Sequence, residues 1–287
     1  MAELLKGAPI VAALNEKLID RVAALKEKGV VPTLAIVRLG ERSEDIAYEN
    51  GAMKRCKKIG VSVKQFILPE GASQNSLIDA IGTINAAPGI HGALLFRPLP
   101  KHIDESLACN SLAAEKDVDG ITNASMAGVF AGTDLGYPPC TPRACMEILD
   151  YYGIDPKGKR AVVVGRSLVV GKPAAMMLLR RHATVTICHT RTADMAAACR
   201  EAEILAVAAG RANVVGSGYL APGQIVLDVG INADESGGLC GDVDFAAAEG
   251  IVKAITPVPG GVGTVTASVL AKHVVEAAEK AAAAMAQ

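Results

Sequence analysis

The sequence predicts an α/β protein built from two three-layer domains, and three observations lead to this prediction. The 287 residues suffice for two domains of ordinary size. Hydrophobic residues make up 51% of the chain but aromatic residues only 3%, so Ala, Val, Leu and Ile must build the core, as in layered α/β proteins. Helical and strand patterns also alternate along the first 120 residues.

The first domain is predicted from alternating helix and strand patterns. Apolar residues recur at helical spacing in residues 9–28, 43–59 and 74–86. The last of these segments follows Ser73, a suitable N-cap. Strand patterns occur at residues 32–38, 61–68 and 91–96. This order indicates helices on both faces of a sheet.

The second domain follows a break in this alternation. Residues 116–120 interrupt the pattern, and residues 138–142 form a proline-rich hinge before a helix at about 143–152. Further strands are predicted at 161–164, 183–187, 204–208, 225–229 and 251–255, with helices at 174–180 and 266–284. Because the last helix is expected to return to the first domain, we predict one domain at 1–140 plus 267–287 and a second at 141–266.

The turn after the strand at 161–164 is the first functional signal. Gly165 and Gly171 flank it, and glycines at a strand-to-helix turn let a phosphate approach backbone N–H groups beside the positive end of the helix dipole. The Gly-x5-Gly spacing differs from the Gly-x-Gly-x-x-Gly fingerprint, so an ordinary α/β turn is the alternative interpretation.

The end of the next strand, residues 183–187, favours a nucleotide and identifies which one. In a mononucleotide-binding unit this is where the adenosine ribose is bound, and an acidic residue there selects NAD. The loop instead carries Thr190 and Arg191, and Arg166 lies in the first turn. Two cations and a hydroxyl favour the 2′-phosphate, so we predict NADP rather than NAD.

Composition and charge exclude several other classes of protein. A net charge of −1 gives no electrostatic reason to expect nucleic acid or an acidic membrane as a partner. No apolar run is as long as a membrane span, and residues 1–6 lack the apolar core of a signal peptide, which predicts a cytoplasmic protein. The seven cysteines include no CxxC pair, so neither a disulfide framework nor a metal site is indicated, and Cys140 and Cys145 are expected to be small core residues.

Several motifs together resemble the bifunctional 5,10-methylenetetrahydrofolate dehydrogenase/cyclohydrolase family over nearly the whole chain. They are Lys116–Gly120, Pro139–Pro142, Val163–Ser167 with Val170 and Gly171, Cys188–His189, Asp228–Asn232, Gly241–Val243 and Ile255–Gly263. The resemblance implies enzymes of one-carbon metabolism with two α/β domains flanking a cleft, a Rossmann-type NAD(P)-binding second domain, a tetrahydrofolate-type small molecule between the domains, and a homodimer.

The resemblance also implies site residues. For the cofactor they are Gly165, Arg166, Ser167, Val170, Gly171, His189, Thr190, Arg191 and Ile231; for the folate, Tyr48, Phe96, Arg97, Pro98, Asp119, Pro259, Gly260 and Gly261. Tyr48, Lys54 and Asp119 are the expected catalytic residues. Each retained residue has a structural alternative: Tyr48 and Phe96 as packing residues, Asp119 as a turn aspartate, and His189 as a loop residue.

Departures from the family concentrate in the expected folate pocket. In the family motif Tyr-x-x-x-Lys-x-Lys, the first lysine serves the cyclohydrolase step; here Tyr48 and Lys54 match, but Ala52 replaces that lysine. Phe96 replaces its glutamine partner, and Thr264-Val265-Thr266 replaces Pro-Met-Thr. Lys54 lies roughly 200° around the helix from Ala52 and is a poor substitute.

These replacements affect the two family reactions differently. Hydride transfer needs alignment and exclusion of water, whereas hydrolysis needs a group that activates water and transfers protons. We therefore predict an NADP-linked methylenetetrahydrofolate dehydrogenase without efficient cyclohydrolase activity. Two alternatives stay open: a paralogue whose pocket, with the added charge of Arg97, takes another substrate, and a nucleotide- or folate-binding protein without catalysis.

Overall fold

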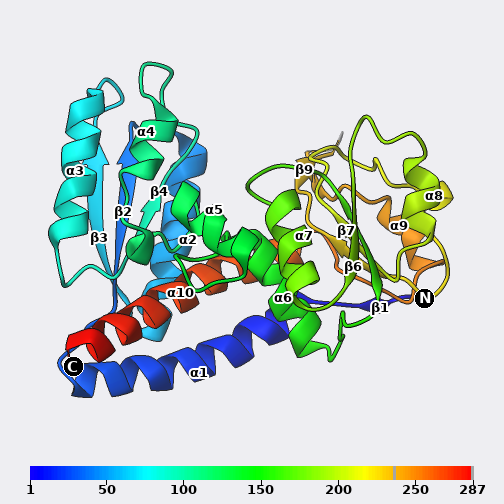
Figure 1. The fold of residues 1–287 in the computed structure, drawn as a ribbon, viewed down its shortest axis with the longest axis horizontal. Helices are drawn as coiled ribbons and strands as arrows, with labels where there is room; N and C mark the ends of the chain where they lie inside the picture. Colours follow the sequence, from blue (N-terminus) through cyan, green and yellow to red (C-terminus); the bar gives the residue numbers. More distant parts are fainter. Residues whose placement is uncertain (235–236, 286–287) are drawn as a thin grey trace. The chain divides into compact units, whose positions relative to one another are not determined.

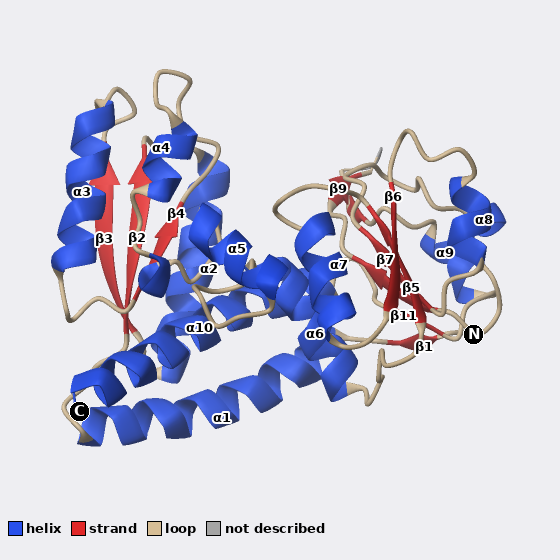
Figure 2. Ribbon diagram, viewed as in Figure 1, coloured by secondary structure: helices blue, strands red, loops and turns tan. Residues whose placement is uncertain are grey.

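The computed structural model describes residues 1–234 and 237–285, which form two compact units. One unit contains residues 1–12 and 141–266 and is built on a six-stranded sheet. The other contains residues 13–140 and the described chain from 267 onward, and is built on a three-stranded sheet. We refer to them as the six-stranded and three-stranded units (Figures 1 and 2).

The six-stranded sheet is wholly parallel and has the order β1-β11-β8-β7-β5-β6. Its strands are β1 (Glu3–Leu4), β5 (Arg160–Val164), β6 (Thr184–Cys188), β7 (Ile204–Val207), β8 (Ile225–Asp228) and β11 (Ala254–Ile255). The helices of this part of the chain are α6 (Cys140–Tyr151), α7 (Gly171–Arg180), α8 (Met195–Arg200) and α9 (Phe245–Glu249). The chain passes from β5 to β6 on one side and then crosses to β7 on the other, so the strand order reverses at β5, as in doubly wound folds.

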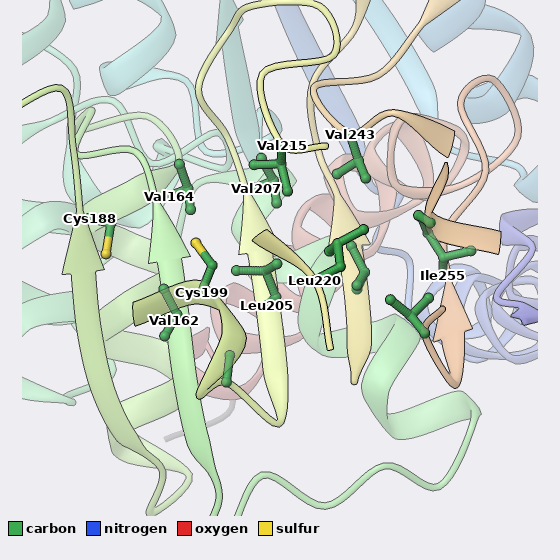
Figure 3. Close-up of a cluster of buried hydrophobic side chains, with 14 residues drawn as sticks. Val162, Val164, Cys188, Cys199, Leu205, Val207, Val215, Leu220, Val243 and Ile255 are labelled. Carbon is green, nitrogen blue, oxygen red and sulfur yellow. The ribbon is translucent and has the colours of Figure 1, made fainter. Parts of the chain in front are cut away.

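Short aliphatic side chains fill the core of this unit. Val162 and Val164 on β5 pack with Leu205 and Val207 on β7, and the cluster extends to Ile255 on β11 (Figure 3). These strands are rich in Val and Ile, as is typical of a parallel sheet that is covered on both faces.

The first strand corrects the domain boundary expected at the N-terminus. Glu3 pairs with Ala254 and Leu4 with Ile255, so residues 1–12 belong to the six-stranded unit rather than to the unit of residues 13–140. A two-residue strand has too little periodicity to be recognised, and its partner lies some 250 positions away.

The three-stranded sheet is also parallel and has the order β3-β2-β4. Its strands are β2 (Thr33–Leu39), β3 (Ser62–Leu68) and β4 (Gly92–Leu95), and its helices include α2 (Ser43–Ile59), α3 (Gln74–Ala86), α4 (Glu105–Asn110) and α5 (Asn123–Ala131). Every residue of the central strand β2 is buried. Ala35, Val37 and Leu39 share a cluster with α3 and α4, whereas the alternate residues Leu34 and Ile36 face the opposite side. Both faces are therefore covered.

Two long helices, α1 (Gly7–Glu27) and α10 (Val262–Met285), cross the divisions between the units. The sequence patterns located every helix longer than nine residues to within a few positions. They did not indicate α4, α5, α8, α9, or the two-stranded ribbon of β9 (Asn232–Ala233) and β10 (Leu239–Cys240). These four helices span five to nine residues and begin at a capping side chain, Asp104, Thr122, Asp194 or Asp244. Among the described helices, none has a stretch long and apolar enough to cross a bilayer.

Candidate active site

The glycine turn after β5 is shaped by contacts that exclude any larger residue. Gly165 has φ 128°, and a Cβ atom there would overlap the carbonyl oxygen of Ala208, the residue that follows β7. A Cβ on Gly171 would overlap the carbonyl of Gly165. Ser167 Oγ accepts hydrogen bonds from Val170 N (3.1 Å) and Gly171 N (3.4 Å). The turn therefore forms a tight cradle that ends at the N-terminus of α7, a suitable place for a phosphate.

The predicted ribose loop lies beside this turn. Val164 pairs with Cys188, and Gly165 N donates to Cys188 O at 2.9 Å, so the two loops leave the sheet at the same edge. Arg166, Thr190 and Arg191 are exposed. The two loops that carry these residues therefore begin side by side, as the prediction of a 2′-phosphate site requires.

His189 has a structural contact in this loop. Its Nδ1 accepts the backbone N–H of Arg191 at 3.0 Å, and its own backbone N–H donates to Thr192 Oγ1 at 2.9 Å. The ring therefore orders the loop that carries Thr190 and Arg191, which supports the structural alternative for this residue without removing it from the cofactor edge.

A cavity in the six-stranded unit lies between the loop after β8 and the loop after β11. Its volume is about 160 Å³, and its lining includes Ile231 together with Pro259, Gly260 and Gly261. Ile231 is 59% exposed and offers an apolar surface beside the glycine-rich loop. The expected cofactor residue Ile231 and three of the expected folate residues therefore share one cavity in this unit.

The three-stranded unit has a cavity of about 310 Å³ at the end of β4. Its polar and aromatic lining consists of Glu44, Asp45, Tyr48, Phe96, Arg97 and Asp119. The rings of Tyr48 and Phe96 meet edge to face, with centroids 5.8 Å apart and an interplanar angle of 83°. Helix α2 and the segment after β4 thus present an aromatic corner to the cavity, with Asp119 on the same lining.

Tyr48 and Phe96 contribute to this corner in different ways. Phe96 is 8% exposed, so it belongs to the core and lines the cavity at once. Tyr48 keeps 43% of its surface exposed, yet the pKa of its hydroxyl is raised, first by burial and then by the negative charge of Asp119. The hydroxyl therefore stays protonated and can act as a hydrogen-bond donor.

Asp117 and Asp119 have separate roles. Asp117 is fully buried and accepts hydrogen bonds from Ile121 N (2.9 Å), Thr122 N (2.8 Å) and Ser125 Oγ (2.6 Å), so it is the aspartate that builds the turn before α5. Asp119 is half-buried and lines the cavity. Burial raises the pKa of Asp119 to about 6, while a hydrogen bond from Cys140 and the charge of Arg97 lower it less.

The remaining residues expected near the folate lie around this cavity or away from it. Arg97 lies on the lining, and its Nη1 is 3.7 Å from Glu105 Oε1, so its charge is partly compensated. Pro98 follows it through a cis peptide bond and is exposed. Ala52 is buried at 2% exposure, whereas Lys54 is exposed and is not among the described residues of the lining. The structure therefore does not bring the expected catalytic lysine to the cavity.

Sequence reasoning missed four carboxylates near these sites. Glu44 and Asp45 line the cavity beside Tyr48, and Asp45 pairs with Arg42 at 2.8 Å. Asp228 and Asp242 lie buried behind the loops after β7 and β8. Burial raises the pKa of Asp228 to about 7 although it accepts several backbone N–H groups. Asp228 and Asp242 belong to the motifs Asp228–Asn232 and Gly241–Val243. An aspartate within two residues of a glycine was therefore the sequence signal that could have identified them.

Comparisons with known proteins match both parts of the chain. Residues 5–119 match the tetrahydrofolate dehydrogenase/cyclohydrolase catalytic domain, and residues 139–282 match the NAD(P)-binding domain of the same family. The bifunctional protein FolD of Carboxydothermus hydrogenoformans is 55% identical over 281 residues, which cover 97% of this chain and 98% of the relative.

Solved structures agree. The bifunctional FolD enzyme of Campylobacter jejuni has a TM-score of 0.95 and 38% identity, covering 98% of this chain and 99% of that one. The Trypanosoma brucei enzyme, solved with NADP and an inhibitor, has a TM-score of 0.90 and 33% identity, covering 97% and 98%. The predicted two-domain α/β fold with a Rossmann-type unit is confirmed, and this chain belongs to the tetrahydrofolate dehydrogenase/cyclohydrolase family of enzymes.

Proposed function

We propose that this protein oxidises 5,10-methylenetetrahydrofolate to 5,10-methenyltetrahydrofolate with NADP and does not hydrolyse the product efficiently. The observation that carries the proposal is an intact glycine turn together with Ala52 and Phe96 at the positions where the family motifs have lysine and glutamine. Phe96 lines the cavity, and Ala52 is buried on α2, the helix that also carries Tyr48. Family membership supports the dehydrogenase reaction, and the replaced residues support the loss of hydrolysis.

The residues at the edge of the six-stranded sheet fit NADP. A Cβ atom at Gly165 or Gly171 would overlap neighbouring backbone, so only glycine keeps the tight turn that leads into the N-terminus of α7, where a pyrophosphate would bind. Arg166, Thr190 and Arg191 would hold the 2′-phosphate through charge-assisted hydrogen bonds. Bound NADP supplies the hydride acceptor; the protein supplies its orientation.

The cavity of the three-stranded unit fits the folate end of the reaction. The aromatic corner of Tyr48 and Phe96 gives a surface on which a flat heterocycle can stack, and the Asp119 carboxylate can accept hydrogen bonds from an amide-like edge. When hydride leaves the carbon between the two nitrogens, their lone pairs stabilise the cation that remains. Alignment and exclusion of water are then sufficient for this step.

Hydrolysis of the methenyl cation demands more from the same cavity. Water must lose a proton to a nearby base, and a buried amine is the group that the family provides. The methyl group of Ala52 has no such function, Phe96 offers no hydrogen bond, and Lys54 is exposed. The relatives are named bifunctional, so retained hydrolysis is the competing outcome.

The test measures both reactions in the purified protein. We expect NADP-dependent formation of methenyltetrahydrofolate and decay of its absorbance no faster than in buffer. Ala52→Lys alone should change little, because Phe96 disfavours a buried ammonium and gives it no partner. The double variant Ala52→Lys with Phe96→Gln should exceed the sum of the single variants.

The outcomes separate the alternatives. Hydrolysis by the unaltered protein at a rate well above buffer contradicts the loss of cyclohydrolase activity. NADP binding without folate binding favours a remodelled pocket, with Arg97 as the place to look for a new anion. Binding of both without turnover favours a non-catalytic protein. We also propose the homodimer and the cytoplasmic location that the family resemblance implies.

A further inference from the structure

Two buried aspartates, Asp228 and Asp242, accept an unusual number of hydrogen bonds behind the carboxyl edge of the six-stranded sheet. Asp228 accepts from Gly230 N (3.3 Å), Asp242 N (2.9 Å) and Val243 N (3.0 Å). Asp242 accepts from the backbone N–H groups of residues 209, 210 and 211 at 2.6, 2.9 and 3.0 Å, and from Asn232 Nδ2 at 2.9 Å.

The loops around these carboxylates are fitted to them. A Cβ atom on Gly230 would overlap the carboxyl group of Asp242, and one on Gly241 would overlap the carboxyl group of Asp228. The carboxyl group of Asp242 thus occupies the space beside Gly230, and the carboxyl group of Asp228 occupies the space beside Gly241. Because the two carboxyl groups together receive N–H groups from all three segments, 208–211, 229–232 and 241–243, they join these segments into one assembly.

This assembly lies past the point where the strand order reverses. Residues 208–211 follow β7 and residues 229–232 follow β8, whereas the predicted adenosine loop follows β6 on the other side of β5. Dinucleotides bind across the crevice at such a reversal, with one nucleotide half on each side. The nicotinamide half would therefore meet the segments that the two aspartates hold, with Ile231 exposed on the second of them.

We propose that Asp228 and Asp242 are positioning residues that hold the loops after β7 and β8 as the wall for the nicotinamide half of the cofactor. The inference rests on the proposed NADP dependence. The carboxylates are buried and act through the loops rather than by touching the cofactor. Their loss should therefore affect binding of the nicotinamide half and spare binding of the adenosine half.

The test compares two ligands by calorimetry: NADP and adenosine 2′,5′-bisphosphate, which carries the adenosine half and its 2′-phosphate but no nicotinamide. Asp242→Asn should weaken NADP by roughly ten- to a hundredfold, the cost of a misplaced binding wall, and leave the bisphosphate within about twofold. Asp244→Asn is the matched control, because that carboxylate also accepts a backbone N–H, from Ala247, but caps α9. It should leave both affinities unchanged.

A second variant keeps the test decisive if Asp242→Asn does not fold. Asn232→Ala removes one tie between the loop after β8 and Asp242 and leaves the carboxylate three backbone partners. It should weaken NADP by several-fold and spare the bisphosphate. Equal losses for the two ligands, or no loss for NADP in a folded variant, would overturn the inference. If the unaltered protein binds neither ligand, the proposed cofactor is refuted, and the inference with it.

Discussion

Asp119 and Asp117 lie two residues apart and should respond in opposite directions to replacement by Asn. The pKa of Asp119 is raised, chiefly by burial, from an ordinary value of 3.8 to about 6. For an acid whose pKa is raised by folding, the ionised form destabilises the folded state. That cost is absent well below the unfolded pKa, grows as the pH rises from about 4 to 6, and is fully present above it.

The size of the effect follows from the same pKa. A difference of about two pH units corresponds to about 3 kcal/mol, and solvent around a half-buried carboxylate reduces this to about 1–2 kcal/mol. Asp119→Asn removes the charge, so it should stabilise the protein near pH 8. Asp117→Asn turns one of the two carboxyl oxygens into an N–H donor that faces a backbone N–H, that of Ile121 or that of Thr122, and should cost on the order of 2–3 kcal/mol.

Thermal denaturation and folate titration together check this reasoning. Asp119→Asn should melt about 2–4 °C higher than the unaltered protein near pH 8, and the difference should narrow as the pH falls towards 5. Its affinity for a tetrahydrofolate should fall at least about tenfold, since a carboxylate acceptor is lost. A lower melting temperature near pH 8, or unchanged folate affinity, would refute the assignment of Asp119 to the cavity and return it to the turn.

Three further predictions concern other residues. Arg166→Ala should weaken NADP by roughly tenfold or more and leave NAD nearly unchanged, as titration with both would show; equal losses would remove its role in discrimination. Gly165→Ala should abolish nucleotide binding measured by calorimetry, because its Cβ would overlap the carbonyl of Ala208 at φ 128°. Lys116→Met should lower the free energy of unfolding, measured by urea denaturation, by about 2–3 kcal/mol without changing nucleotide affinity, because its Nζ donates to three carbonyls at the end of α3.

Periodicity located the long elements because they bury a continuous stripe or face. The strand at 161–164 and the helix at 74–86 lie within one residue of β5 and α3. The short helices and strands were not predicted because their stability comes from capping side chains and tertiary contacts rather than from a periodic apolar pattern. Strand β1 is the clearest case, since two residues gain a partner only when Ala254 and Ile255 are folded beside them.

Site residues could be predicted from the sequence where the backbone geometry requires one residue type. They could not be assigned separate roles where two residues of the same type lie close together. Gly165 and Gly171 could be selected because only glycine fits the cradle. The motif Asp-Val-Asp contains a turn aspartate and a cavity aspartate, and nothing in the letters distinguishes Asp117 from Asp119. Their difference lies in hydrogen-bond partners that are up to eight residues away, at Ser125.

The same limit applies to the lysine motif, because a residue that matches the motif in sequence need not lie at the cavity in the structure. Lys54 agrees with the family motif, yet its side chain is exposed, whereas the buried position on the other face of the helix, two residues earlier, belongs to Ala52. A base for water must be both near the substrate and partly desolvated, so that its pKa approaches the working pH. Lys54 is exposed and does not lie on the described lining of the cavity. Retention of Lys54 therefore gives no support to hydrolysis, and the proposed separation of the two family reactions rests on the exchanges at Ala52 and Phe96.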